Sequence, residues 1–354
     1  MNFIVTNAAC PNPAGGPKNS HSMFTFPIED AEIPMSAGEM LANSIPFGQR
    51  ILITGCQGLL GQKLHSLLVG ANHIIGLDLA ETSLLRGESF EYHRLDITDR
   101  EAVVKMVSGT KPAFIINTAA MTDVDLCEVE RDRCWRINVL AVENLIRACK
   151  KADAHLIHIS SDYVFDGKRA PYSEVDPTSP LGFYGKSKLA GENALRGAGL
   201  PCTIVRTQVL YGTAPNIRPN FVSFILEKLR GADSLNIVDD QRGMPTLADD
   251  LAQGIARVIQ LRKEGIFHMA GRDSISRWEF ARAIARVFGD DPERIHPIKT
   301  GQLKQKAPRP ADSTFALDKI QRELAFLSRG IEACLKEYQR QLSEQAASYG
   351  GVIS

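Results

Sequence analysis

The sequence predicts an α/β protein built on a doubly wound parallel sheet, with a smaller, partly discontinuous C-terminal lobe. From residue 50 to about residue 207, short apolar runs of strand length alternate with longer segments of helical period, which is typical of parallel strands covered by helices on both faces. A glycine-rich turn joins the first run to the first helix. Beyond residue 210 the alternation loosens, which indicates the second lobe.

The strands of the first domain are expected at short runs that are apolar throughout, because strands buried on both faces do not alternate with polar residues. Such runs occur at 50–55, 73–78, 113–120, 155–161 and 202–207. The segments between them have the period of amphipathic helices. The expected helices are 59–69, 100–108, 128–152 and 181–197.

The second half of the chain predicts helices at 221–230, 248–262, 277–288, 317–324 and 331–342, with short strands at 235–238 and 266–269. Residues 1–47 are rich in Pro, Gly, Ser and Asn without a sustained period, which favours a flexible tail. We therefore expect a tail at 1–47, a first domain at 48–210, a lobe at 211–345 with segments returning to the first domain, and a tail at 346–354.

Composition excludes several classes of protein. Lys and Arg number 41, as do Asp and Glu, and this balance argues against nucleic acid or an anionic membrane as the main partner. The sequence has no apolar stretch long enough to span a bilayer and no secretory signal pattern. Seven cysteines occur at irregular spacing without a CxxC pair. The sequence thus predicts a cytoplasmic protein with reduced cysteines and no cysteine-based metal site.

The glycine-rich turn has the spacing Gly55, Gly58, Gly61 and lies between the first strand and the first helix. Glycines permit a tight turn and let the backbone approach a pyrophosphate, which then lies at the N-terminus of the helix. Asp78 ends the second strand, where a carboxylate can bind ribose hydroxyls. The pattern predicts an NAD(P)-binding, Rossmann-type domain, with a glycine turn that binds no ligand as the alternative.

Asp78 favours NADH, because a 2′-phosphate would meet a like charge there. Nearby basic residues such as Arg86 would still accommodate NADPH. The cofactor is therefore expected to be NADPH or NADH.

A second motif, YGKSK, places Tyr184 and Lys188 four residues apart, and thus on one face of the predicted helix at 181–197. A free tyrosine has a pKa of about 10, and a fixed cation nearby lowers it toward the range useful for proton transfer. Ser160 and Ser161 end the preceding strand, at the edge where such sheets bind ligands. Serine, tyrosine and lysine beside a dinucleotide loop predict hydride-transfer chemistry.

With these motifs the chain resembles the extended short-chain dehydrogenase/reductases and, within them, the dTDP-4-dehydrorhamnose reductases. The resemblance runs from about residue 50 to 342 and rests on ITGCQGLLG, INTAAMTDVDLCE, ISSDYVFDG, YGKSKLAGE, VDDQRGMPT and RPADSTFALDK. It implies reduction of the 4-keto group of a nucleotide-linked deoxysugar, in this family dTDP-4-dehydro-L-rhamnose, to give dTDP-L-rhamnose.

The resemblance also implies roles for individual residues. The family's catalytic residues fall on Ser161, Tyr184 and Lys188. Its cofactor contacts fall on the loop after the first strand and on the ends of later strands, namely Gly55, Gln57, Gly58, Leu59, Leu60, Gly61, Asp78, Asp96, Ile97, Thr118, Ala119, Ala120, Tyr184 and Lys188. Substrate contacts are expected from Asp162, Tyr163, Gln208, Val209 and Arg309.

Some of these assignments have structural alternatives. Asp162 and Tyr163 could form a strand-end turn, Arg309 could form a salt bridge between lobes, and Asn138 could be a buried structural amide or a support for the site. The family usually has RTSWLYG where this chain has RTQVLYG, which leaves the exact sugar nucleotide open. The resemblance alone suggests Mg2+, and no carboxylate cluster for the ion is evident. A homodimer is expected as a partner, while the sequence leaves the oligomeric state open.

Two other functions fit parts of the pattern. The regulatory β subunit of methionine adenosyltransferase resembles the chain at ISSDYVFDG and YGKSKL, and would make it a binding protein with little turnover. VDDQRGMPT, which has the reductase form, argues against it. An epimerase or dehydratase would explain the nucleotide-binding motifs but not the RPxxS segment.

Overall fold

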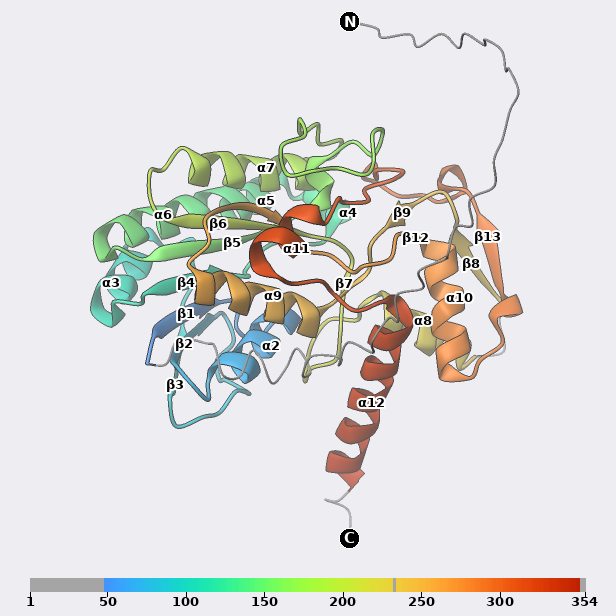
Figure 1. Ribbon diagram of the computed structural model, residues 1–354, viewed down its shortest axis with the longest axis horizontal. Coiled ribbons are helices and arrows are strands. Elements are labelled where there is room, and N and C mark those ends of the chain that lie inside the picture. Colours follow the sequence, from blue (N-terminus) through green and yellow to red (C-terminus); the bar gives the residue numbers. More distant parts are fainter. Residues whose placement is uncertain (1–47, 232–233, 351–354) are drawn as a thin grey trace, which may run out of the picture.

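Seven parallel strands form the central sheet of the computed structural model, which describes residues 48–231 and 234–350. Their order is β3-β2-β1-β4-β5-β6-β11, so the order reverses between β1 and β4, as in a doubly wound sheet. This arrangement confirms the predicted fold class (Figure 1). The strands are β1 (Arg50–Thr54), β2 (His73–Asp78), β3 (Phe90–Arg94), β4 (Phe114–Asn117), β5 (His155–Ser161), β6 (Cys202–Thr207) and β11 (Gly265–His268).

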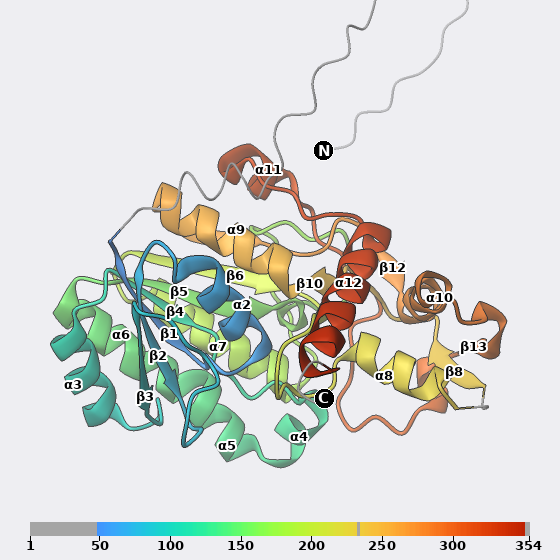
Figure 2. The same cartoon turned by 90° about the horizontal axis from the view of Figure 1, so that it is seen from below.

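Each buried strand sends successive side chains to opposite faces of the sheet, and both faces are apolar. In β1, Ile51 and Ile53 pack into one core cluster and Leu52 into the other. Three helices cover the first face: α2 (Leu59–Leu68), α9 (Ala248–Leu261) and α11 (Asp318–Leu324). The second face is covered by α3 (Arg100–Thr110), α6 (Ala141–Ala152) and α7 (Phe183–Arg196) (Figure 2).

The prediction of one long helix over 128–152 is wrong, because the segment is broken into four parts. They are α4 (Val124–Val129), α5 (Arg131–Trp135), the π-helical turn η1 (Arg136–Leu140) and α6. Asp123 caps α4 by accepting a hydrogen bond from the Leu126 N–H, so the helix begins earlier than expected. Glu130 then leaves the helical region, with φ −100° and ψ 56°, and separates α4 from α5.

The strand expected over 113–120 is also shorter than predicted, because β4 ends at Asn117. Thr118 turns away and donates a hydrogen bond from Oγ1 to the Thr54 carbonyl, with an O···O distance of 2.6 Å. The next residues therefore lie beside the turn that follows β1.

The C-terminal lobe is built around the helices α8 (Phe221–Leu229), α10 (Arg277–Phe288) and α12 (Ile331–Gly350). The parallel strands β8 (Leu235–Val238) and β13 (Ile295–Ile298) pack on them. Two-residue strands connect the lobe with the first domain, namely β7 (Leu210–Tyr211), β9 (Arg242–Gly243), β10 (Thr246–Leu247) and β12 (Ile275–Ser276). The segments α9, β11 and α11 belong to the main sheet and its cover although they lie beyond residue 210.

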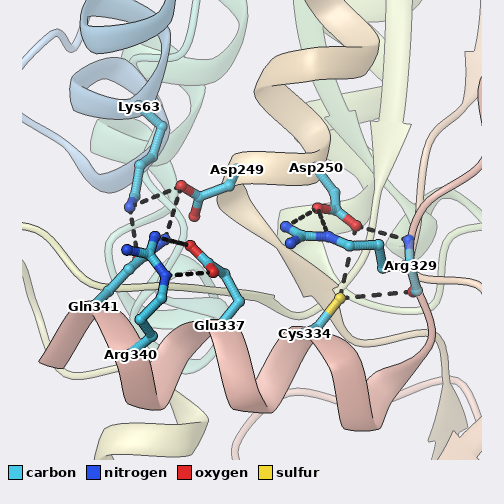
Figure 3. A network of polar contacts seen from close by, with 8 residues as sticks. All are labelled: Lys63, Asp249, Asp250, Arg329, Cys334, Glu337, Arg340 and Gln341. Carbon is cyan, nitrogen blue, oxygen red and sulfur yellow. Dashed lines mark hydrogen bonds and ion pairs between the residues drawn. The ribbon is translucent and has the colours of Figure 1, made fainter. Parts of the chain in front are cut away.

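Helix α12 lies between the first domain and the rest of the lobe, and polar contacts fix it there (Figure 3). Lys63 of α2 forms an ion pair with Asp249 of α9 at 3.0 Å and donates to Gln341 of α12 at 2.9 Å. Just before α12, Arg329 donates from Nε to the buried Asp250 at 2.9 Å. The cofactor-side helix α2, α9 and the lobe are therefore joined at one place.

Helix α12 includes residues 346–350, which the sequence predicts as part of a C-terminal tail; the rest of that expected tail lies outside the described residues. The tail expected at 1–47 lies outside the described residues. Within 48–231 and 234–350, no helix combines the length and the apolar character needed to cross a membrane.

Candidate active site

The turn after β1 leaves no room for side chains at two of its glycines. A Cβ on Gly61 would lie 2.4 Å from the Gly55 carbonyl oxygen, and a Cβ on Gly55 would lie 2.9 Å from the backbone nitrogen of Ala119. Gly55 also has φ +68°, a conformation that favours glycine. Gly58 is the N-cap of α2 and no side chain caps that end. The turn therefore has the form of a backbone cradle for a phosphate group.

The other residues expected at the cofactor lie around this cradle. The carboxylate of Asp78 accepts hydrogen bonds from the backbone N–H groups of Gln57 at 2.9 Å and Leu79 at 2.8 Å, which fixes it beside the loop. The side chain of Leu60 is buried in the core, so only its backbone is available to a ligand. The glycines and the placement of Asp78 fit an NAD(P) dinucleotide.

Strand ends at the same edge of the sheet supply the remaining expected cofactor contacts. Ala119 packs against Gly55, and Thr118 donates to the carbonyl at the end of β1. Asp96 is exposed after β3 and accepts from the Thr98 N–H at 2.8 Å, whereas the side chain of Ile97 is buried. The structure thus brings these residues to the carboxyl edge of the sheet, where such folds bind ligands.

Tyr184 and Lys188 lie in the first two turns of α7, and both are buried. The Tyr184 hydroxyl is hydrogen-bonded to the Ser161 side chain, while burial raises the pKa of Tyr184 above its ordinary value. Lys188 donates from Nζ to the Ile159 carbonyl at 2.6 Å. Burial lowers the pKa of Lys188 to about 8, and Glu192 opposes that shift.

These shifts decide the charges at neutral pH. The pKa of Tyr184 is raised, so the tyrosine keeps its proton at neutral pH, and the expectation that a fixed cation would lower this pKa is wrong, because burial has the larger effect. Lys188, with its pKa lowered to about 8, is mainly charged at pH 7. The site therefore holds a phenol that is ready to donate a proton, with a cation on the same helix face to stabilise the phenolate that would result.

Strand alternation distinguishes the two serines at the end of β5. Ser160 Oγ donates to the buried Glu192 carboxylate at 2.5 Å. Ser161 Oγ instead lies at Tyr184 and accepts from the Tyr163 N–H at 3.2 Å. Only Ser161 is therefore in contact with the tyrosine.

A pocket adjoins this group between the two lobes. Its wall includes Tyr163, whose ring lies 5.4 Å from that of Tyr184 between centroids. The pocket is lined by residues from the ends of β5 and β6, from β9, from the start of α10 and from the segment 309–313, namely Asp162, Tyr163, Val209, Gln241, Arg242, Gly243, Arg277, Arg309, Pro310 and Ser313.

Three arginines, Arg242, Arg277 and Arg309, line the pocket, and only Arg309 was expected there from the sequence. Arg309 lines the pocket and also forms a bidentate ion pair with Asp125, at 2.7 and 3.0 Å, which lowers the pKa of Asp125 to about 2. Arg277 packs over the Phe221 ring at 5.4 Å, and among the described residues its guanidinium forms no ion pair. No sequence motif indicated Arg277; Gln241 and Arg242 fall in VDDQRGMPT and Ser313 in RPADS.

The two residues that depart from the family pattern have different places. Val209 lines the pocket with φ +37°. Gln208 is 1% exposed and hydrogen-bonds to Ser313 and Met244 behind the pocket wall. The buried amide of Asn138 bonds to Met121 and Ser187, which favours its structural role.

A doubly wound sheet with this glycine loop and a serine, tyrosine and lysine at its carboxyl edge defines an NAD(P)-dependent short-chain dehydrogenase/reductase of the extended type. The family model described as the RmlD substrate binding domain matches residues 49–344. A dTDP-4-dehydrorhamnose reductase of Aggregatibacter actinomycetemcomitans is 34% identical over 81% of this chain and 97% of its own length. The chain belongs to the dTDP-4-dehydrorhamnose reductase family.

Solved structures agree with this assignment. A dTDP-4-dehydrorhamnose reductase from Clostridium acetobutylicum has a TM-score of 0.74 and 33% identity, covering 83% of this chain and 99% of the other. One from Bacillus anthracis, in complex with NADP, has a TM-score of 0.72 and 30% identity, covering 83% and 100%. The methionine adenosyltransferase 2 subunit beta of Rattus norvegicus is also similar, at 32% identity over 77% of this chain and 82% of its own.

Proposed function

We propose that this protein reduces the 4-keto group of dTDP-4-dehydro-L-rhamnose to give dTDP-L-rhamnose, with NADPH or NADH as the reductant. The observation that carries the proposal is the contact between Tyr184 and Ser161, with Lys188 one turn further along α7, at the sheet edge between the glycine loop and the pocket. Curated relatives with the same reductase name cover most of the chain.

The chain's own residues would perform the proton chemistry. When bound, the reduced nicotinamide supplies a hydride to C4 of the sugar. Tyr184 donates its phenolic proton to the C4 oxygen, which would otherwise carry the negative charge. Lys188 stabilises the phenolate that remains, and Ser161 holds the tyrosine oxygen and the sugar oxygen in register. The reaction converts a ketone, a hydride and a proton into an alcohol.

The pocket supports a nucleoside diphosphate as the carrier of the sugar. Arg277 and Arg309 line it together, and guanidinium groups bind phosphate oxygens well. Asp162 and Tyr163 extend the wall toward Tyr184, where the keto sugar would lie. Val209, in place of a larger family residue, borders the same space and would adjust the fit to the sugar.

Replacing Tyr184 by Phe tests the proposal. The ring keeps its packing against Tyr163 and only the hydroxyl is lost, so the fold should persist. General acid catalysis contributes roughly 10²–10⁴ in rate, so turnover should fall at least about a hundredfold. The measurement is NADPH oxidation with dTDP-4-dehydro-L-rhamnose generated in situ, alongside cofactor binding as the control. A variant as fast as the wild type would remove Tyr184 as the proton donor.

The similarity to a methionine adenosyltransferase subunit supports a second candidate, a regulatory protein with little turnover. It predicts no reduction of any nucleotide-linked 4-keto sugar by the wild type and no effect of Tyr184→Phe on the partner enzyme. The same activity measurement therefore separates the two functions.

We further propose a homodimer in the cytoplasm, and the family resemblance suggests Mg2+. No group of three or more His, Cys, Asp or Glu side chains within the part of the chain that the structure describes could hold the ion. We therefore assign Mg2+ no protein ligands.

A further inference from the structure

A chain of buried hydrogen bonds leads from Ser161 to the C-terminal lobe. Ser161 Oγ donates to one oxygen of the Asp162 carboxylate at 2.9 Å, and Ser313 Oγ donates to the other at 2.6 Å. All three side chains are at most 6% exposed. One carboxylate thus joins the end of β5 to a segment about 150 residues later in the chain.

Gln208 holds the far end of this chain. Its Nε2 donates to the Ser313 carbonyl at 2.7 Å, and its Oε1 accepts from the Met244 N–H at 2.8 Å. The space around it is full, because a Cβ on Gly243 would lie 2.8 Å from that Oε1. The amide therefore has both its ends bound to backbone and does not reach the pocket.

These contacts determine how Ser161 meets Tyr184. A serine hydroxyl has a single proton, and that of Ser161 points to Asp162. The orientation of Ser161 therefore depends on Asp162, and so does its hydrogen bond with Tyr184, which lowers the pKa of Tyr184 against the effect of burial. If Asp162 moved or turned, Ser161 would lose this orientation.

We propose that Asp162, Ser313 and Gln208 are positioning residues that fix the Ser161 hydroxyl for catalysis, and that Gln208 acts through this chain instead of contacting the sugar. The inference rests on the proposed reductase function. On this proposal Gln208, which departs from the family pattern, helps to set the geometry of the site. Recognition of the sugar then depends on the residues of the pocket wall.

A double-mutant cycle tests the coupling. Three substitutions are made alone and each together with Ser161→Ala, namely Asp162→Asn, Ser313→Ala and Gln208→Glu. The Gln208→Glu substitution keeps the side chain's shape, but the new side chain cannot donate to the Ser313 carbonyl. Misplacing a catalytic group by about 1 Å can cost up to about a hundredfold, so each single variant should lower kcat about tenfold while KM changes less than about twofold. In the Ser161→Ala background the same substitutions should lower kcat no further, because coupled residues are not additive.

Thr203→Val is the control, since Thr203 is a wholly buried hydroxyl residue near the start of β6, the strand that ends just before Gln208, and so lies at the end remote from the site. It should lower the melting temperature and leave kcat unchanged. Two results would overturn the proposal and indicate direct substrate contact. In the first, the losses of kcat from Asp162→Asn and Gln208→Glu multiply with the loss from Ser161→Ala. In the second, KM alone rises strongly.

A crystal structure of the Gln208→Glu variant gives a readout that does not depend on activity. The proposal requires a displaced Ser313 and a Ser161 Oγ that no longer bonds to Asp162. An unchanged Ser161–Asp162–Ser313 geometry would overturn it. A wild type that reduces no 4-keto sugar would refute the proposed function by itself, and this structure would then still decide whether the chain positions Ser161.

Discussion

Substituting Glu192 by Gln should destabilise the protein strongly, because Glu192 neutralises a buried arginine. Its carboxylate accepts from Arg206 Nε at 2.9 Å and Nη2 at 2.7 Å, and from Ser160 Oγ at 2.5 Å. Glu192 is 0% and Arg206 1% exposed. The neighbouring His268 stays neutral, because burial lowers its pKa well below the usual value, so Arg206 and the nearby Lys188 are the cations that Glu192 balances.

The expected loss follows from this geometry. Gln has the same size but cannot accept both guanidinium N–H bonds at full strength, and it leaves the arginine charge buried. Breaking a buried ion pair by removing one partner costs about 3–5 kcal/mol. At roughly 2–4 °C per kcal/mol for domains of 150–250 residues, the melting temperature should fall by about 6–20 °C.

Urea unfolding followed by circular dichroism, with thermal melting beside it, measures the change. Glu143→Gln is the control, since the Glu143 side chain is partly exposed and lies 3.9 Å from Arg147 on α6; this loss should stay below about 0.5 kcal/mol. Replacing both Glu192 and Arg206 by Leu should recover part of the stability. A Glu192→Gln protein with the wild-type urea midpoint would refute the reasoning.

Two further predictions concern the cofactor and the pH dependence. Gly61→Ala should weaken NADPH binding, measured by calorimetry, at least about tenfold, since its Cβ would lie 2.4 Å and 2.6 Å from backbone atoms of Gly55 and Cys56 and a displaced loop loses phosphate contacts. Gly58→Ala, with its nearest contact at 3.2 Å, should have a smaller effect, and equal effects would contradict the cradle. The kcat/KM of ketone reduction should fall about tenfold per pH unit above about 8, because the charged form of Lys188, with its pKa lowered to about 8, is lost there. A flat profile from pH 7 to 9.5, or the same fall in Lys188→Met, would contradict this assignment.

The buried strands were predictable from the sequence because their signal is local. The runs at 155–161 and 202–207 match β5 and β6 at both ends, since continuous apolar residues between turns are sufficient to define such strands. The break at Glu130 and the π-helical turn that follows were not predictable. They depend on one backbone conformation and on packing against α7, and neither leaves a pattern in the hydrophobic period.

The site divides in the same way. Gly55, Gly61 and the Tyr184–Lys188 pair carry their geometry in short spacings, so the sequence indicated them. Arg277 and the role of Gln208 depend on partners more than 50 residues away, such as Phe221 and Ser313. The tertiary fold determines which side chains line the pocket. A sequence motif therefore does not predict whether a residue lines the pocket wall or lies behind it.

The contacts at α12 help to set the relative position of the first domain and the C-terminal lobe, which together form the site. The glycine loop continues directly into α2, and Lys63, in the second turn of that helix, is bound to Asp249 and Gln341. The pocket wall comes from both lobes, so its width depends on their relative position. Because Gln341 of α12 is hydrogen-bonded to Lys63 of α2 and to Asp249 of α9 (Figure 3), a shift of the lobe would have to break these bonds next to the cofactor helix. These bonds hold the lobe that carries Arg277 against the domain that carries Tyr184, and hydride transfer to a single carbon requires a defined separation of the two.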